Sequence, residues 1–141
     1  MSHIRNCIER IPSWTFTVLA LCAIVYLTLV PRPLPPMEIM KFPHFDKVVH
    51  ALMFGGLVGA MLLDYTRQGG VRTIRFTLLS VVLSTCFGGV IELLQSCMSM
   101  GRSGDWYDFM ADAGGAIVFA GLAPLFRTIF RHTKNEQSND E

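Results

Sequence analysis

The chain has 141 residues, of which 51% are hydrophobic and only 16% are charged. A soluble domain carries about 25% charged residues, so this composition favours a small, single-domain membrane protein over a soluble one. The net charge of +1 and the lack of a long basic run argue against a nucleic-acid partner.

Four apolar segments are long enough to be membrane spans, because about 20 helical residues cross ~30 Å of hydrocarbon. The first segment follows two arginines, as a signal peptide does. It is long for a signal peptide, however, and no small-x-small cleavage motif precedes its prolines, so we expect a retained span. The expected spans are residues 14–30, 46–65, 75–98 and 105–126.

The remaining segments are polar or rich in proline. Residues 1–13 are expected to be a cytoplasmic N-terminus, and the prolines of residues 31–45 keep that connection extended. Residues 127–141 are predicted to be a polar, disordered cytoplasmic tail, because the end of the chain lacks an apolar period. The four spans then form one domain over residues 14–126.

The lysines and arginines indicate the orientation of the spans. With both termini cytoplasmic, eight of the 12 basic residues lie inside, namely Arg5, Arg10, Arg67, Arg72, Arg75, Arg127, Arg131 and Lys134. The other four, Arg32, Lys41, Lys47 and Arg102, lie outside. The positive-inside rule therefore favours this topology. We predict an all-α integral membrane protein, a bundle of four transmembrane helices in the bacterial cytoplasmic membrane with both termini cytoplasmic.

Glycine and cysteine are expected to serve helix packing. Small residues let helices approach closely in lipid. They occur as Ala51, Gly55 and Gly59 at four-residue intervals, as Gly88 with Gly89, and as Gly114 with Gly115. The four cysteines form neither a metal-site spacing nor a disulfide framework, so we expect them to pack as small hydrophobes.

Three spans carry polar side chains at a similar depth. The uncharged stretch 113–126 measures only ~21 Å as a helix, so its span must include some of the acids before it. The uncharged stretch 76–91 measures ~24 Å and ends at Glu92. Spacings of three or four residues place each polar set on one side of its helix. These residues form a predicted outward-facing polar pocket: Asp46, Lys47, His50, Glu92, Gln95, Arg102, Asp105, Asp108 and Asp112.

Ionisable groups inside a span need partners. A charged group costs about 2.5 to 3.5 kcal/mol at the centre of an inserting helix, so it faces a protein interior or a wet cavity. We expect Glu92 and Asp112 to pair with Arg102, Lys47 or His50. The helix dipole favours acids near a helix start, and Asp105 is a candidate N-cap.

At these residues the sequence resembles the VanZ-like family of small bacterial membrane proteins, named for an accessory protein of glycopeptide resistance. The resemblance rests on DKVVHALMF (46–54), IELLQ (91–95) and GRSGDWYDFMADAGGA (101–116), and it covers roughly residues 40–126. The family pattern points to Asp46, Lys47, His50, Glu92, Gln95, Gly101, Arg102, Asp105 and Asp108. The family commonly has Asn where this chain has Asp112. The resemblance implies a cell-envelope protein connected with teicoplanin susceptibility, in a family without a settled biochemical activity.

Two main functions stay open. The first is a non-catalytic accessory or binding protein that interacts with the lipid bilayer and with a lipid, a lipid-linked wall precursor or a lipoglycopeptide. The second is a membrane enzyme that modifies such a molecule at the outer leaflet. There, Lys47 and Arg102 would hold a phosphate or carboxylate, and Glu92 or His50 would act as general base. Ser96, Ser99 and Ser103 are available nucleophiles but carry no activating motif.

Three further interpretations concern the charged groups themselves. His50, Glu92, Asp108 and Asp112 are plausible ligands for Mg²⁺ or Ca²⁺, but no motif fixes the ligand count, so we expect no metal and no cofactor. Acids within spans can relay protons, but the cytoplasmic halves of the spans are nearly free of ionisable groups. Finally, the charges could form an ion-pair network that only holds helix ends together. The oligomeric state is not fixed by the sequence.

Overall fold

The computed structural model describes residues 12–30, 42–98 and 105–139, with side chains up to Pro124. This part of the chain forms four helices, α2 (Thr15–Leu29), α3 (Phe45–Arg67), α4 (Ile74–Met98) and α5 (Trp106–Asn139). No strand occurs within these ranges. The prediction of an all-α fold is therefore confirmed. The predictions for residues 1–11 and for the proline-rich segment 31–41 concern residues outside the described ranges.

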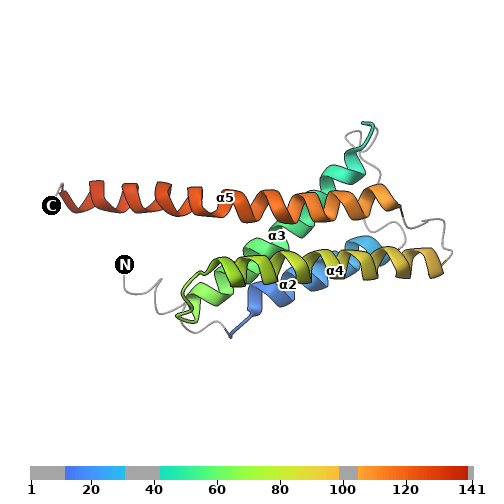
Figure 1. Cartoon of the computed structure of the whole chain (residues 1–141), viewed down its shortest axis with the longest axis horizontal. Helices are drawn as coiled ribbons and strands as arrows, with labels where there is room; N and C mark the ends of the chain where they lie inside the picture. The colour runs from blue at the N-terminus through green and yellow to red at the C-terminus, as the bar shows by residue number, and fades with distance from the viewer. Residues whose placement is uncertain (1–11, 31–41, 99–104, 140–141) are drawn as a thin grey trace.

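Helix α3 occupies the centre of the arrangement. It crosses the other three helices and contacts each of them, while α4 also packs directly against α5 (Figure 1). Its residues Phe54 and Leu57 pack with Ile24 of α2 and Ile91 of α4. A second apolar cluster joins α3 to α5 through Val58, Leu62 and Ala116. The starts of α3 and α5 and the end of α4 lie at one end of the bundle (Figure 1).

The helix limits agree with the predicted spans to within two residues, except at the end of α5. That helix continues to Asn139, so residues 127–139 are helical and differ from the disordered tail that we predicted. The physical reason is local. After Pro124 the sequence up to Asn139 contains neither glycine nor proline, and its Lys, Glu and Gln residues are good helix formers. The end of the apolar stretch is therefore not the end of the helix.

Helix α4 has an apolar exterior and a partly polar interior. Its exposed side chains include Leu78, Leu79, Val82, Leu83, Val90 and Leu93. Its buried side chains include Thr77, Ser80, Ser84, Glu92 and Gln95. A soluble protein places these types of residue the other way round, whereas a helix in lipid turns its polar groups towards protein neighbours. Both α3 and α4 are long and apolar enough to cross a membrane, and α2 is apolar but shorter.

Close helix contact depends on particular glycines. A Cβ atom on Gly115 would collide with the backbone of Ala51, and one on Gly55 would lie 3.0 Å from the Gly115 carbonyl oxygen. On α4, a Cβ on Gly88 would lie 2.6 Å from Asp112 Oδ2. The predicted packing role is confirmed for these positions. Gly114 differs, because a Cβ there would meet nothing within 4 Å.

The cysteines do not have the packing role that we expected. Cys22, Cys86 and Cys97 are free and exposed on the outside of the helices, and Cys7 lies outside the described residues. Their positions match the apolar exterior, where a thiol is tolerated as a small hydrophobe. The expectation that they pack against other residues was therefore wrong for these three cysteines.

Candidate functional site

Ionisable side chains gather where α3 begins, α4 ends and α5 begins. We call seven of them the polar cluster: Asp46, Lys47, His50, Glu92, Asp105, Asp108 and Asp112. The chain reverses direction between α4 and α5, so the end of one helix lies beside the start of the next (Figure 1). The polar residues that the sequence places at similar depths on three helices are therefore close together in space.

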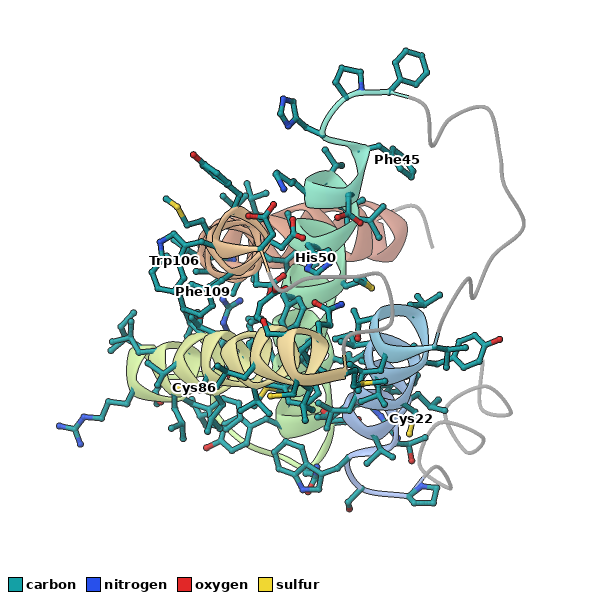
Figure 2. The ribbon with its side chains drawn as sticks, turned by 90° about the vertical axis from the view of Figure 1, so that its right-hand side faces the viewer. Cys22, Phe45, His50, Cys86, Trp106 and Phe109 are labelled. Carbon is teal, nitrogen blue, oxygen red and sulfur yellow. The ribbon has the colours of Figure 1, made fainter. Side chains whose placement is uncertain are left out.

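Three buried groups form the inner part of the polar cluster. His50 Nδ1 lies 2.9 Å from Asp112 Oδ1 and 4.0 Å from Glu92 Oε1. The exposed fractions of His50, Glu92 and Asp112 are only 2%, 8% and 0%. In Figure 2 His50 lies on α3 beside the first turns of α5. One histidine and two acids, each from a different helix, therefore meet away from solvent.

Two carboxylate oxygens in this inner part have no hydrogen-bond partner among the described residues. They are Glu92 Oε1 and Asp112 Oδ2. A buried polar atom without a partner costs about 1–3 kcal/mol, and more when it is charged. Most such atoms in folded proteins are satisfied by protein, water or an ion. The two buried oxygens therefore lower the stability of the fold, which nevertheless retains them.

Lys47 joins α3 to the start of α5. Its Nζ donates to Asp105 Oδ2 at 2.9 Å and to Asp108 Oδ1 at 2.8 Å. It also lies 5.7 Å from the centre of the Tyr107 ring. Because two carboxylates already engage this ammonium group, an anionic ligand would have to compete with both. The predicted role of Lys47 as an anion holder is therefore weakened.

Asp105 and Glu92 together cap α5. Asp105 Oδ1 accepts the Tyr107 backbone N–H at 2.9 Å, which confirms the predicted N-cap. The Asp105 backbone N–H in turn donates to Glu92 Oε2 at 2.7 Å. Glu92 therefore performs, from a neighbouring helix, the reciprocal part of a capping box. One of its oxygens has a structural role and the other has no described partner.

The remaining predicted site residues have different positions. The Gln95 side-chain amide donates to the Thr28 carbonyl of α2 at 3.0 Å and so connects helices instead of joining the polar cluster. Asp46 is exposed, but one of its oxygens lies within 4.8 Å of ligand atoms on His50 and Asp108. Arg102, Ser99 and Ser103 lie outside the described residues. Ser96 is exposed, and its hydroxyl donates to the Glu92 carbonyl at 2.9 Å.

Sequence reasoning missed Asp64, which is completely buried at the opposite end of α3. Its Oδ2 accepts the Thr17 backbone N–H at 2.8 Å and the Thr17 hydroxyl at 2.9 Å. Its Oδ1 accepts from Arg67 at 3.2 Å. The N-cap residue of α2, Trp14, makes no side-chain capping bond, so Asp64 caps this helix from α3. The end opposite the polar cluster therefore does contain a buried acid. The available signal in the sequence was the spacing of Asp64 and Arg67, an acid and a base three residues apart at the end of one helix.

The Lys47 contacts give a first testable expectation. Replacing Lys47 by methionine should lower the thermal unfolding midpoint in detergent by a few degrees, because Asp105 and Asp108 lose their shared counter-charge. In a double-mutant cycle, Asp108→Asn should cost less in the Lys47→Met background than in wild type. Additive shifts would show that the Lys47–Asp108 pair contributes nothing to stability.

Long apolar helices with polar groups on their inner faces define a helical membrane protein. The sequence comparison refines this class. The VanZ/LLP1 family model matches residues 14–127, so the chain belongs to the VanZ-like family, whose members are membrane proteins of uncertain function. No curated protein and no solved structure matches the chain.

Proposed function

We propose that this chain is a non-catalytic accessory protein of the bacterial cell envelope, which binds an amphiphilic molecule at the outer leaflet through the polar cluster. In this proposal residues 14–126 form one domain of four membrane spans in the cytoplasmic membrane, and both termini are cytoplasmic. The distribution of lysine and arginine supports this orientation. It directs the polar cluster outward, towards wall precursors and drugs.

The observation that carries the proposal is the buried group of His50, Glu92 and Asp112. Polar residues inside a membrane are costly and mark functional sites by default. A network kept only for stability would satisfy its polar atoms, yet Glu92 Oε1 and Asp112 Oδ2 have no hydrogen-bond partner among the described residues. Proteins retain destabilising groups of this kind where function requires them. These observations therefore support a binding site over an ion-pair network that only holds the helices together.

The charge of the polar cluster indicates which ligand groups it would accept. Its five carboxylates outnumber its one lysine and one histidine, so it favours a cationic group, such as the amine of a glycopeptide. An anionic group would instead be held by Arg102, which the sequence places in the segment before α5. A guanidinium binds a phosphate or carboxylate through two parallel hydrogen bonds. We therefore propose a ligand that carries charges of both signs, such as teicoplanin or a lipid-linked wall precursor.

The His50–Asp112 contact favours a second candidate function, an enzyme that modifies the same class of molecule. A carboxylate 2.9 Å from an imidazole nitrogen fixes the orientation and tautomer of the ring, as in general-base catalysis. Water would then be the nucleophile, because the Ser96 hydroxyl is exposed and donates to a backbone carbonyl. Release of a product from a purified lipid-linked precursor would separate this function from binding alone.

The test is expression of the chain in a teicoplanin-susceptible Gram-positive host. Wild type should raise the inhibitory concentration of teicoplanin several-fold over an empty vector. Glu92→Gln and Arg102→Gln should return it to the vector value, whereas the exposed Ser96→Ala should behave as wild type. Immunoblots of membrane fractions should show equal amounts of all variants. Equal susceptibility of the vector and wild-type strains would reject the teicoplanin part of the proposal.

Binding is tested separately with purified protein in lipid nanodiscs. A fluorescent teicoplanin and a polyprenyl-pyrophosphate wall precursor are the two probes. At least one should bind wild type in a saturable manner and bind Glu92→Gln at least tenfold more weakly. Equal binding by both proteins would exclude the polar cluster as the binding site.

A further inference from the structure

We propose that His50, Glu92 and Asp112 bind a divalent transition-metal ion of the class of Zn²⁺ and Mn²⁺. This inference goes beyond the proposed envelope function and does not depend on the identity of the amphiphilic ligand. It also departs from the prediction made from sequence, which expected no metal and considered only Mg²⁺ or Ca²⁺ as an alternative.

The three side chains lie close enough together to share one ion. Each of the three residues offers one ligand atom, and these three atoms all lie within 4.8 Å of one another. His50 Nδ1 is 2.9 Å from Asp112 Oδ1 and 4.0 Å from Glu92 Oε1. Nitrogen and oxygen ligands about 2.0–2.2 Å from one ion are ~3–4 Å apart, depending on the angle at the metal. The three atoms therefore need only small movements to coordinate one ion.

One unpartnered carboxylate oxygen faces the space between these side chains. Glu92 Oε1 is buried without a hydrogen bond among the described residues, and it is the Glu92 atom nearest to the imidazole. The other Glu92 oxygen accepts the Asp105 backbone N–H at 2.7 Å, which holds the carboxylate in position. Such outer hydrogen bonds typically orient metal ligands. Asp112 Oδ2 packs against Gly88, so Oδ1 would be the ligand atom of Asp112.

The charge of the three side chains also suits a divalent ion. Two carboxylates and one neutral imidazole carry two negative charges, which a divalent ion neutralises. Without a metal ion, protons on the imidazole or on a carboxyl group must balance these charges, and metal binding would displace them. The Lys47 ammonium on the same helix as His50 is already engaged by Asp105 and Asp108. A divalent ion thus balances the inner part of the polar cluster.

The ligand types select the class of metal. Mg²⁺ and Ca²⁺ take oxygen ligands almost exclusively, whereas imidazole is a good ligand for Zn²⁺ and related transition ions. Three ligands leave at least one coordination position for water or for a ligand group. Because the ligands come from α3, α4 and α5, the bound ion would also hold three helices together and stabilise the fold.

The test uses the full chain in detergent, stripped with a chelator and then dialysed against Zn²⁺ or Mn²⁺. Elemental analysis should give about one ion per chain, and the thermal unfolding midpoint should rise by several degrees. Mg²⁺ and Ca²⁺ at the same concentration should leave the midpoint unchanged. Co²⁺ in place of Zn²⁺ should give a visible absorption band, which reports coordination directly. Failure to bind any of the transition ions, with an unchanged midpoint, would overturn the proposal.

Variants locate the ion. Glu92→Gln keeps an oxygen for the Asp105 N–H but removes the ligand charge, so it should fold and bind Zn²⁺ at least tenfold more weakly. His50→Gln should abolish the Co²⁺ band. Ser96→Ala, one turn from Glu92 and outside the polar cluster, should bind as wild type. Undiminished Zn²⁺ binding by Glu92→Gln would place the ion elsewhere, for example at the exposed cysteines, and would reject the site.

Discussion

Replacing Asp64 by alanine is expected to lower the free energy of unfolding by about 3–5 kcal/mol, the usual cost of removing one partner of a buried charged group. Asp64 is fully buried and accepts hydrogen bonds from the Thr17 backbone, the Thr17 hydroxyl and Arg67. The substitution removes the cap of α2 and leaves the Arg67 charge without this acceptor. Unfolding in mixed micelles with increasing sodium dodecyl sulfate measures the difference.

Two milder variants separate the contributions to this effect. Asp64→Asn keeps one oxygen for Thr17 and should recover part of the lost stability. Thr17→Val removes the hydroxyl but keeps the backbone N–H, so it should cost about 1.5–3 kcal/mol, the value of one hydrogen bond to a charged group. Wild-type stability of Asp64→Ala would contradict the cross-helix cap. A loss of equal size in Asp64→Asn would instead assign the stabilisation to the charge.

Gly115→Ala is the second substitution with a large expected effect. A Cβ there would collide with the backbone of Ala51, which cannot move aside as a flexible side chain does. The helices α3 and α5 must then separate, at a cost of at least 1–3 kcal/mol, as for other overpacked sites. The neighbouring Gly114→Ala is the matched control, because its Cβ would meet nothing within 4 Å. It should leave stability unchanged or raise it by about 0.5–1 kcal/mol through helix propensity.

The same substitution should affect the polar cluster. Ala51 follows His50 in α3, and Gly115 lies one turn beyond Asp112 in α5, so separating these helices lengthens the His50–Asp112 contact. Gly115→Ala should therefore bind Zn²⁺ more weakly than Gly114→Ala when both variants are dialysed against Zn²⁺ and the bound ion is measured by elemental analysis. Equal stability and equal metal binding of the two variants would show that the close approach of α3 and α5 is not needed.

Glu92 combines a structural role and a proposed ligand role in one carboxylate. Oε2 caps α5 through the Asp105 N–H, whereas Oε1 faces His50 without a hydrogen bond among the described residues. A loss of stability after Glu92→Leu would therefore not distinguish the two roles. Glu92→Gln does so because it keeps one oxygen for the cap and replaces the charged oxygen by a neutral amide NH2 group of similar size.

Hydropathy and spacing determined much of this molecule without a structure. Runs of apolar residues predicted four helices with limits correct to within two residues, apart from the end of α5, because helix formation follows local composition. The lengths of the uncharged stretches placed Glu92 and Asp112 at a similar depth, and the position of His50 one turn after Asp46 placed it there as well. Asp105 at the start of α5 was recognisable as an N-cap from the residue type and its position. These features depend on neighbours in sequence.

The tertiary structure alone decided which groups meet. His50 forms a hydrogen bond with Asp112, and Lys47 donates to Asp105 and Asp108. The Gln95 side chain donates to the carbonyl of Thr28. The structure also shows that Asp64 caps a helix 47 residues earlier in the chain. These partners depend on how each helix is rotated and how closely it approaches its neighbours. That geometry is set by contacts between residues that are far apart in sequence, such as Gly115 and Ala51. The periodicity of residues along one helix carries no information about such contacts.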